Sequence, residues 1–379
     1  MKVGILTLPL WNNYGGILQA YALKHTLETI NCETVLIDLH RKRPAKYSEL
    51  IQGVKFQIKK IFFDKDKITV YPNIKESLYI SQNTLAFVEK ELYPKSRKVY
   101  HFNDLMDIAK DLDGVIVGSD QVWRPNYTPN IYNYFLDFVG EETKKVSYAA
   151  SLGTDEWLFT EEETLRCKEL LGRFDAVSVR EDTAVSIIDD KFGVKADFVL
   201  DPTLLLESND YNFLIDKYSE QANAGQVFTY ILDRSEKNKK YVERVSNALG
   251  YDSFEVMPKK FDTEFSFDIN NYIFPSVTQW LRSFHDAKFI IADSFHGCVF
   301  AIIYNKPFIA IGNVERGLSR FYSLLNTFGL IDRLVLNVDD VDLSILDRKI
   351  NWERVNLIRE KMKANSINYL SDSLYAKNE

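Results

Sequence analysis

This 379-residue chain has few cysteines and no excess of positive charge. The three cysteines, Cys32, Cys167 and Cys298, lie far apart and form no Cys-x-x-Cys pair, which argues against a disulfide framework and a thiolate metal site. Lys and Arg total 47 against 54 for Asp and Glu, a formal net charge of −7. This balance argues against nucleic acid as a partner, so an anionic ligand must be bound by local Arg side chains or by helix ends.

The sequence also lacks a long apolar run. The longest, at residues 299–304, ends at Asn305-Lys306-Pro307 and is far shorter than the roughly 18 residues of a membrane-spanning helix. The apolar start at Val3–Leu8 is too short for a signal peptide. We therefore expect a cytoplasmic protein, and a peripheral contact at the inner face of the membrane stays open.

Short runs rich in Val and Ile recur along the chain, and each is followed by a polar cluster and a helical period. This pattern is typical of βα units around a mostly parallel sheet. The runs form two successive sets, at residues 3–8, 34–37, 114–117, 146–149, 176–179 and 198–200, and then at residues 227–232, 253–256, 289–292 and 308–311. The sequence therefore predicts an α/β fold of two Rossmann-like lobes that face a central cleft.

Turn and linker residues between positions 201 and 225 separate the two sets. We therefore predict an N-terminal domain at residues 1–205 and a C-terminal domain at residues 206–345. Residues 346–379 form a helical segment, in which apolar positions between Trp352 and Leu374 have helical spacing.

Residues 42–98 are predicted to be an insertion in the first domain. Lys55–Lys67 mixes basic residues with Phe and Ile at near-helical spacing. The pattern fits an amphipathic surface helix packed on its own domain, and also a helix that contacts a membrane surface or a partner. We favour the first interpretation, because long apolar stripes at this period are usually buried.

Ligands of open α/β sheets bind beyond the carboxyl ends of the strands, so the residues after each strand are the candidates. The first strand is followed by Asn13-Tyr14-Gly15-Gly16, at the start of a helix that contains Gln19. Two glycines let backbone N–H groups approach a phosphate, a carboxylate or a sugar hydroxyl at the helix N-terminus. A tight turn that needs positive φ explains the same pair equally well.

The third strand is followed by a hydroxyl, a carboxylate, an amide and an indole within five residues, Ser119, Asp120, Gln121 and Trp123. Sugar sites often use such a mixture, with the sugar ring stacked on an aromatic side chain. Ser151 follows the fourth strand and joins this candidate site.

Arg180 ends the fifth strand where a helix begins, a position that suits a bidentate grip on carboxylate or phosphate. The alternative is an ion pair with Glu181, Asp182 or Asp201 that only ties loops together. We favour the ligand-binding interpretation, because strand-end Arg residues that face a cleft often contact ligands. The DPT segment at residues 201–203 is interpreted as the end of the domain rather than as chemistry.

His296 is the one of five histidines that directly follows a buried strand in the first turn of a helix. The positive end of a helix favours neutral imidazole, which can accept a proton. Ser294 as N-cap, Asp293 as orienting group and Gly297 for close approach favour a catalytic histidine over a structural one. Cys298 begins an apolar run and is predicted to be inert.

Two cations follow the last predicted strand. Arg316 and Arg320 stand one helical turn apart, so their side chains project from one side of a helix. We expect them to be able to receive a phosphate.

Taken in order, these segments resemble the polysaccharide pyruvyl transferase family. The matching pieces are NYGG at 13–16 with LQAYAL at 18–23, GSDQVW at 118–123, SYAAS at 147–151, SVRE at 178–181, DPT at 201–203 and DSFHG at 293–297. Each piece alone is weak, but six pieces in sequence are specific at the level of the family.

The resemblance implies the two-domain glycosyltransferase B fold and transfer of a pyruvyl group from phosphoenolpyruvate to two hydroxyls of a sugar, with a cyclic ketal and phosphate as products. The acceptor would be a surface polysaccharide of a capsule or exopolysaccharide, or its lipid-linked precursor, on the first domain, and the donor would bind the second. No metal or cofactor is implied, because Arg groups could stabilise the leaving phosphate. The implied catalytic residues are His296, as acid and base, with Arg180 and Asp120. The implied substrate-binding residues are Asn13, Tyr14, Gly15, Gly16, Gln19, Ser119, Gln121, Trp123, Ser151, Ser294, Gly297, Arg316 and Arg320.

One position departs from the family pattern. Some members place an Arg two residues before the matching His, where this chain has Ser294, and Arg316 or Arg320 would then supply the charge. The acceptor sugar is not implied. Two other functions stay open: a nucleotide-sugar-dependent glycosyltransferase of the same architecture, and a non-catalytic sugar-binding protein of a polysaccharide assembly complex.

Overall fold

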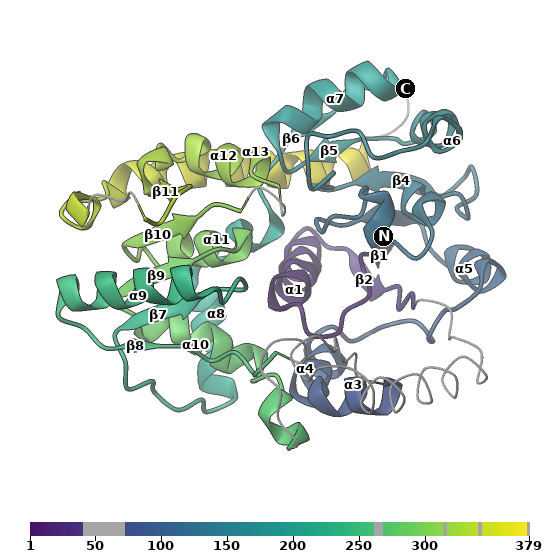
Figure 1. Ribbon diagram of the computed structural model, residues 1–379. Helices are drawn as coiled ribbons and strands as arrows, with labels where there is room; N and C mark the ends of the chain where they lie inside the picture. Colours follow the sequence, from purple (N-terminus) through teal and green to yellow (C-terminus); the bar gives the residue numbers. More distant parts are fainter. Residues whose placement is uncertain (41–72, 261–267, 314–316, 340–342, 377–379) are drawn as a thin grey trace, which may run out of the picture.

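The computed structural model describes residues 1–40, 73–260, 268–313, 317–339 and 343–376. These residues form two lobes, each built on a parallel β-sheet with helices around it (Figure 1). The predicted Lys55–Lys67 helix and Arg316 lie outside the described residues.

The sheet of the first lobe has the strand order β2-β1-β3-β4. Its strands are β1 (Lys2–Leu6), β2 (Glu33–Leu36), β3 (Gly114–Val117) and β4 (Lys144–Ser147). Two short strands, β5 (Ser178–Val179) and β6 (Asp197–Phe198), pair with each other. Single bridges from Val146 to Ala176 and from Ala150 to Val179 attach this pair beside β4. β3 is buried along its whole length, because its sequence GVIV has no polar side chain on either face.

The sheet of the second lobe has the strand order β11-β10-β9-β7-β8. Its strands are β7 (Val227–Tyr230), β8 (Ser253–Phe254), β9 (Phe289–Ala292), β10 (Phe308–Ile311) and β11 (Leu334–Val335). The central strands β7, β9 and β10 are buried throughout, as expected for parallel strands with helices on both faces.

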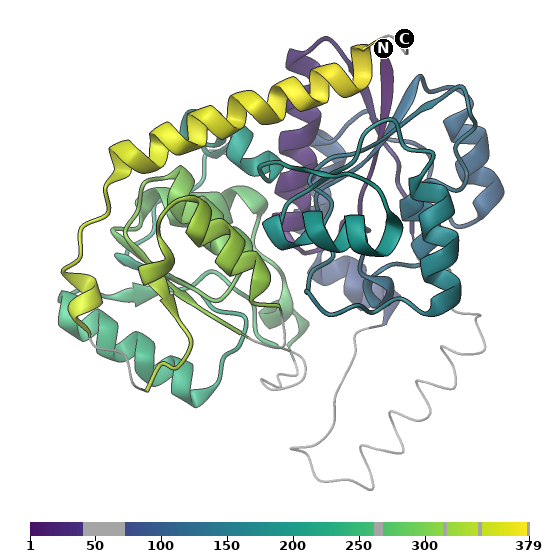
Figure 2. The same ribbon diagram turned by 90° about the horizontal axis from the view of Figure 1, so that it is seen from above.

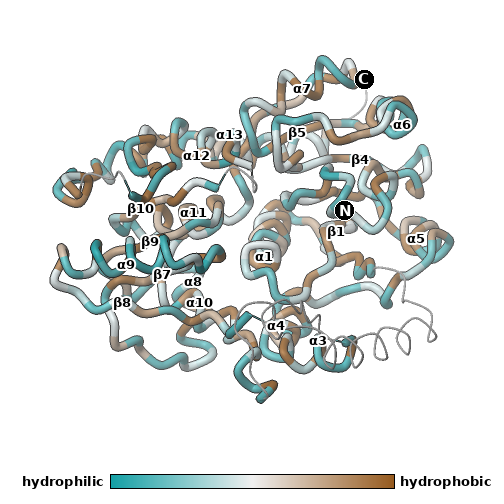
Figure 3. The backbone as a smooth tube through the Cα atoms, in the orientation of Figure 1, coloured by the Kyte–Doolittle hydropathy of each residue, from teal (hydrophilic) through white to brown (hydrophobic). Residues whose placement is uncertain are grey.

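Helices cover both sheets. In the first lobe they are α1 (Tyr14–Thr29), α3 (Ile74–Ile80), α4 (Gln82–Glu91), α5 (Phe102–Ala109), α6 (Glu161–Leu171) and α7 (Asp182–Phe192). In the second lobe they are α8 (Ser208–Lys217), α9 (Glu236–Leu249), α10 (Val277–Asp286), α11 (Phe295–Ile303) and α12 (Ser319–Thr327). Outer helices such as α9 are largely hydrophilic in Figure 3, so each lobe keeps its apolar residues toward its sheet.

The two lobes pack against each other rather than hanging from a free linker. Tyr14, at the start of α1, stacks on Trp280 of α10 with ring centroids 5.4 Å apart, and its hydroxyl donates to the Pro275 carbonyl at 2.9 Å. One hydrophobic cluster includes β1 residues of the first lobe and β9 residues of the second. The relative placement of the lobes is therefore set by buried contacts.

The C-terminal helix α13 (Trp352–Tyr375) runs from the second lobe back across the first (Figure 2). Arg359 donates to the Leu204 and Leu206 carbonyls at 3.1 and 2.7 Å. Further along, the Tyr369 hydroxyl donates to the Ser147 carbonyl at 2.9 Å. α13 therefore fastens the inter-lobe connection to β4.

Each of the ten predicted strands overlaps a strand of the structure, and the predicted final helix corresponds to α13. β11 was missed, because two residues give no readable alternation. The described part of the predicted insertion, residues 73–98, holds α3 and α4, and Asn83 of α4 donates to the Phe274 carbonyl of the second lobe at 2.9 Å.

In both sheets the strand order reverses at one point, between β1 and β3 in the first lobe and between β7 and β9 in the second. From two neighbouring parallel strands the chain there leads toward opposite edges of the sheet. Loops diverge at such a point and leave room beyond the carboxyl ends of the strands. In the first lobe this edge carries Asn13–Gly16 and Gly118–Asp120. In the second lobe it carries Asp293–His296.

Candidate functional site

His296 of the second lobe lies directly against the first lobe. It occupies the first turn of α11, and its Nε2 atom is 3.5 Å from Oδ2 of Asp201. Its side chain is 11% exposed. We call the six residues around this contact the inter-lobe cluster: Ser119, Ser151, Arg180, Glu181, Asp201 and His296. The cluster draws members from both lobes, so it exists only while the lobes are in contact.

Asp201 is the centre of the inter-lobe cluster, and its side chain is fully buried. Oδ1 accepts hydrogen bonds from the backbone N–H and the hydroxyl of Thr203, at 3.0 and 2.6 Å. Oδ2 accepts from Ser119 Oγ at 2.8 Å and from Arg180 Nη1 at 2.9 Å. Burial would raise the pKa of this carboxyl, but His296, Arg180 and the Thr203 hydroxyl outweigh it and hold the pKa well below its usual range. Asp201 is therefore a carboxylate.

The interpretation of residues 201–203 as a mere domain end was wrong. Asp201 does begin the short 3₁₀ turn Pro202–Leu205 as its N-cap, but its other oxygen faces Arg180 and His296. The sequence held one usable signal, an Asp at the carboxyl end of a strand. Its partner on the other lobe could not be read from spacing.

Arg180 adopts the ion-pair alternative rather than an open ligand-binding position. Nη1 donates to Asp201, and Nε donates to Oε1 of Glu181 at 3.3 Å. The Phe295 ring covers the guanidinium at 4.5 Å, and the side chain is 2% exposed. Glu181 Oε1 also accepts from Ser151 Oγ at 2.6 Å. A direct contact between Arg180 and a ligand would require these buried pairs to open.

The two glycines at the start of α1 are explained by close approach. A Cβ atom on Gly15 would lie 2.1 Å from Nδ1 of His296, and one on Gly16 would lie 3.0 Å from Oδ2 of Asp120. Neither glycine has positive φ, so the tight-turn alternative is wrong. Asn13 caps the helix by accepting from the Gly16 N–H at 3.2 Å, and its amide donates toward Asp120 Oδ2 at 3.5 Å.

Several predicted sugar contacts are buried parts of the framework. Trp123 is fully buried, donates from Nε1 to the Tyr134 carbonyl at 3.0 Å and stacks on Phe135 at 5.2 Å. Gln19 is also fully buried and donates to Thr7 Oγ1 at 2.8 Å. The predictions that Trp123 and Gln19 contact a sugar are therefore wrong, because neither has a surface that faces a ligand.

Other predicted contacts hold the lobes or the cluster together. Tyr14 is buried against Trp280, and a Cβ on Gly297 would lie 2.6 Å from Cβ of Ala292. Both residues therefore serve packing, which corrects their assignment to substrate. Ser119 and Ser151 are fully buried donors to Asp201 and Glu181, so their hydroxyls serve these carboxylates.

Two predicted helpers of His296 have different roles. Ser294 stands at the N-cap position of α11, but its side chain makes no capping hydrogen bond. Asp293 accepts from the backbone N–H groups of Leu232 and Asp233, both at 2.7 Å. Asp201 therefore occupies the place predicted for Asp293. Burial raises the pKa of the Cys298 thiol, in keeping with an inert cysteine.

Polar side chains beside the cluster are less buried. Arg124 donates to Oε1 of Gln121 at 3.0 Å and lies 4.2 Å over the Tyr127 ring. Burial, and then the nearby Arg180 charge, lower the pKa of Arg320 to about 10. Arg320 therefore stays cationic at neutral pH. Arg124 was missed as a candidate, although it follows the predicted sugar segment directly.

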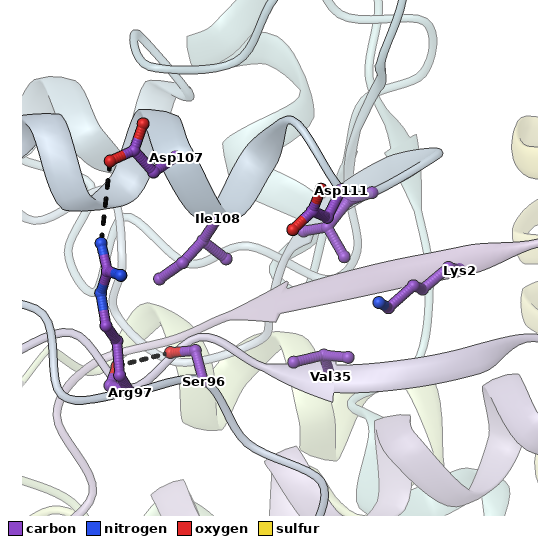
Figure 4. Close-up of a pocket in the computed structure, with 8 residues that line it drawn as sticks. Lys2, Val35, Ser96, Arg97, Asp107, Ile108 and Asp111 are labelled. Atoms are coloured by element: carbon purple, nitrogen blue, oxygen red, sulfur yellow. Dashed lines mark hydrogen bonds and ion pairs between the residues drawn. The ribbon is translucent and has the colours of Figure 1, made fainter.

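A separate pocket opens on the first lobe beside β2 and α5 (Figure 4). Lys2, Val35 and Ile108 line it, together with an ion pair between Arg97 and Asp107 at 3.8 Å. Arg97 is 60% exposed. The pocket shares no residue with the inter-lobe cluster, so we assign the chemistry to the cluster.

Within the part of the chain that the structure describes, His, Cys, Asp and Glu form no group of three or more suited to a metal ion. None of the described helices combines the length and apolarity needed to cross a membrane.

The model of one protein family, described as polysaccharide pyruvyl transferase, matches residues 13–315. The chain belongs to this family. The matched region begins at the cap of α1 and includes all six residues of the inter-lobe cluster. A comparison with curated proteins finds no match.

Solved structures show the fold of this family member. UDP-GlcNAc 2-epimerase from Neisseria meningitidis bound to UDP-GlcNAc is 11% identical, with a TM-score of 0.52 and full coverage of both chains. A putative UDP-N-acetylglucosamine 2-epimerase from Listeria monocytogenes is also 11% identical, with a TM-score of 0.52 over 100% of this chain and 97% of the other. Arabidopsis thaliana UGT89C1 complexed with UDP-L-rhamnose is 10% identical, with a TM-score of 0.51 over 98% of each chain. The predicted glycosyltransferase B fold, with two Rossmann-like lobes, is confirmed.

Proposed function

We propose that this family member transfers the pyruvyl group of phosphoenolpyruvate to two hydroxyls of a sugar, in a surface polysaccharide or its lipid-linked precursor. One observation carries the proposal: an imidazole from the second lobe, His296, lies against a buried carboxylate and the glycine-lined helix start of the first lobe. A donor on one lobe and an acceptor on the other would meet at this contact. Such a precursor would be reached at the cytoplasmic face of the membrane.

The first chemical step is protonation of the donor. Phosphoenolpyruvate must gain a proton at its methylene carbon, which leaves an oxocarbenium-like centre at the carbon that bears the phosphate. A positioned histidine acting as general acid contributes about 10²-fold or more to such a step. His296 supplies the proton in this proposal.

The second step adds the two sugar hydroxyls. The first hydroxyl attacks the cationic carbon and returns its proton to His296. The second hydroxyl then displaces phosphate, and its proton leaves with the phosphate. At the ketal carbon the two new C–O bonds replace the π bond and the bond to phosphate, the methylene carbon keeps its new C–H bond, and His296 ends in its starting state.

Charge near the contact supports a doubly anionic donor. Arg320 comes from the second lobe, stays cationic and feels the charge of Arg180 across the lobes. We assign it to the donor phosphate or carboxylate, in the role left open by Ser294. Arg316 keeps the same predicted role. Asn13 and Asp120, at the edge of the first lobe, are assigned to the acceptor hydroxyls.

The proposal is tested by incubating the full chain with phosphoenolpyruvate and a panel of lipid-linked and nitrophenyl sugars. We expect phosphate release together with a carboxyethylidene group on the sugar, detected by mass spectrometry. His296→Gln should reduce turnover by about 10²-fold or more, while the matched control His285→Gln changes a 44% exposed histidine and should keep it. Absence of product across the whole panel contradicts the proposal.

A nucleotide-sugar-dependent glycosyltransferase is the second candidate, favoured by a pocket in the second lobe. It lies at the carboxyl ends of β7, β9 and β10 and is lined in part by Ser235, Asn238, Asp293 and Gly312. Two carboxylates, Asp233 and Asp293, also line this pocket. Their negative charge would repel the phosphates of a nucleotide sugar. Thermal stabilisation by UDP or GDP, without any by phosphoenolpyruvate, would favour this function.

If the protein instead binds sugar without catalysis, His296→Gln should leave its sugar affinity and its biological activity intact. Titration of the same sugar panel against both proteins separates this outcome from the enzyme.

A further inference from the structure

We propose that Asp201 is the positioning residue that holds His296 in the Nε2–H tautomer, so that Nδ1, which faces Gly15, is the nitrogen that exchanges a proton with the substrate. The tautomer follows from geometry alone. The exchange rests on the proposed function.

The first step of the argument concerns Nε2. This atom is fully buried, with no hydrogen-bond partner at ideal distance. Asp201 Oδ2 lies 3.5 Å from it. Because a carboxylate can only accept hydrogen bonds, the proton of a neutral imidazole is stabilised on the nitrogen that faces Asp201.

The second step concerns the charge state of Asp201. Its two oxygens together receive four hydrogen bonds, from the Thr203 N–H and hydroxyl, Ser119 and Arg180. A carboxylate that accepts this many donors stays ionised even when buried. Asp201 therefore remains an acceptor for Nε2–H throughout a catalytic cycle.

The third step concerns the opposite edge of the ring. Nδ1 faces Gly15, where a Cβ atom would lie 2.1 Å away. The imidazole itself fills the place that a side chain at position 15 would take, beside Asn13 and Asp120. Nδ1 is thus the ring nitrogen that lies on the predicted acceptor side.

Proton accounting then assigns each nitrogen a single role. Nδ1–H of the imidazolium goes to the methylene carbon of the donor, and the proton of the attacking hydroxyl returns to Nδ1. Nε2–H stays with Asp201 in both steps. Because Asp201 belongs to the first lobe and His296 to the second, the imidazole is oriented only while the lobes are together.

The tautomer can be measured without any substrate. Full-length protein labelled with ¹⁵N at histidine is examined by long-range ¹H–¹⁵N NMR at alkaline pH, and the His296 signals are identified by their loss in His296→Gln. We expect neutral His296 to carry its proton on Nε2. A proton on Nδ1 in the wild-type protein overturns the proposal.

Asp201→Asn sharpens the test, because it removes the charge that holds the proton on Nε2. The Thr203 N–H donates to the Oδ1 position and Arg180 Nη1 donates to the Oδ2 position, so the amide oxygen can occupy either one. An amide oxygen facing His296 attracts the Nε2 proton less than a carboxylate does, and an NH₂ group facing His296 moves the proton to Nδ1. In both orientations we expect the preference for Nε2–H to weaken in the NMR spectrum, and a spectrum identical to that of the wild type contradicts the proposal.

Activity gives a second readout. A wrong tautomer in Asp–His systems costs up to about 10⁴-fold in kcat, so we expect Asp201→Asn to lower kcat by about 10²-fold or more, with KM for phosphoenolpyruvate changed less than about threefold. Thr203→Val is the matched control, because it removes one donor to Asp201 and keeps the carboxylate. It should preserve the tautomer and most of kcat.

The outcomes separate the two proposals. An Nε2–H tautomer in a protein that never consumes phosphoenolpyruvate supports the role of Asp201 and rejects the proposed reaction. If Asp201→Asn raises KM for phosphoenolpyruvate and leaves kcat unchanged, Asp201 belongs to donor binding and the positioning role is rejected. If Asp201→Asn does not fold, the wild-type tautomer decides.

Discussion

The role of a single residue in this protein depends on which side chains face it. Arg180 is the clearest case: its place at a strand end suggests ligand binding, yet its guanidinium is paired with Asp201 and Glu181 and covered by Phe295. Removing one partner of a buried ion pair typically costs about 3–5 kcal/mol. An Arg180 variant would therefore report on stability before it reports on donor affinity.

Asp137 gives a prediction at this scale, since burial raises its pKa to about 6 and its Oδ1 atom has no hydrogen-bond partner. A raised carboxyl pKa means that the folded state prefers the protonated acid. Its contribution to stability is present below the unfolded pKa and is lost as pH rises through 6. Asp137→Asn should therefore be more stable than the wild type above pH 6, by about 1–2 kcal/mol after allowance for solvent screening.

Urea unfolding between pH 4 and pH 8 checks this expectation. The advantage of Asp137→Asn should grow between pH 4 and pH 6 and stay constant above. The exposed Asp111→Asn is the control and should match the wild type at each pH. A constant advantage at every pH would assign the effect to something other than titration.

At the scale of elements, the first turns of two helices contact each other at the site. α1 brings Gly15 and α11 brings His296, and each helix follows the central region of its sheet. The long helix α13 then spans both lobes and buries Arg359 against the carbonyls of the connection at Leu204 and Leu206. The connection carries Asp201 at its start, so α13 also supports the inter-lobe cluster.

Arg359→Met should destabilise this arrangement, because two buried carbonyls lose a charged donor. Hydrogen bonds to charged groups contribute about 1.5–3 kcal/mol each, and we expect a total loss of about 2–4 kcal/mol. Urea unfolding followed by tryptophan fluorescence measures it. Arg354→Met, at an exposed position of the same helix, should cost less than about 0.5 kcal/mol. Equal losses in the two variants would contradict the role of Arg359.

At the scale of the whole molecule, Gly317 makes a further contact between the lobes. Gly317 has a φ of +87°, and a Cβ on it would lie 2.1 Å from the Gly153 carbonyl of the first lobe. Arg320 follows within one turn. This contact therefore places the predicted donor side of the second lobe directly against the first.

Gly317→Ala should hold the lobes apart and lower turnover. Gly250→Ala is its matched control, because Gly250 also has positive φ, +66°, with nothing within 4 Å of the added Cβ. Both variants should lose about 1–2 kcal/mol from backbone strain. Only Gly317→Ala should show a larger radius of gyration in small-angle X-ray scattering, and identical scattering from the two variants would contradict the contact.

The sequence by itself determined the features that depend on local pattern. Strands, their order along the chain and the placement of His296 at a strand end follow from periodicity and turn chemistry, which act over a few residues. The family followed from six short motifs. These local signals were enough to locate the edge of each sheet where the site lies.

Only the tertiary structure decided which side chains face each other. Trp123 was predicted to stack on a sugar ring, but it is buried in the core of the first lobe. Asp201 was predicted only to end a domain, but its side chain faces His296 of the other lobe. Burial and pairing depend on how two sheets from separate parts of the chain pack together, and no spacing along the chain carries that information. The same packing gives Gly15 its purpose, because a glycine is required where another lobe comes within van der Waals contact.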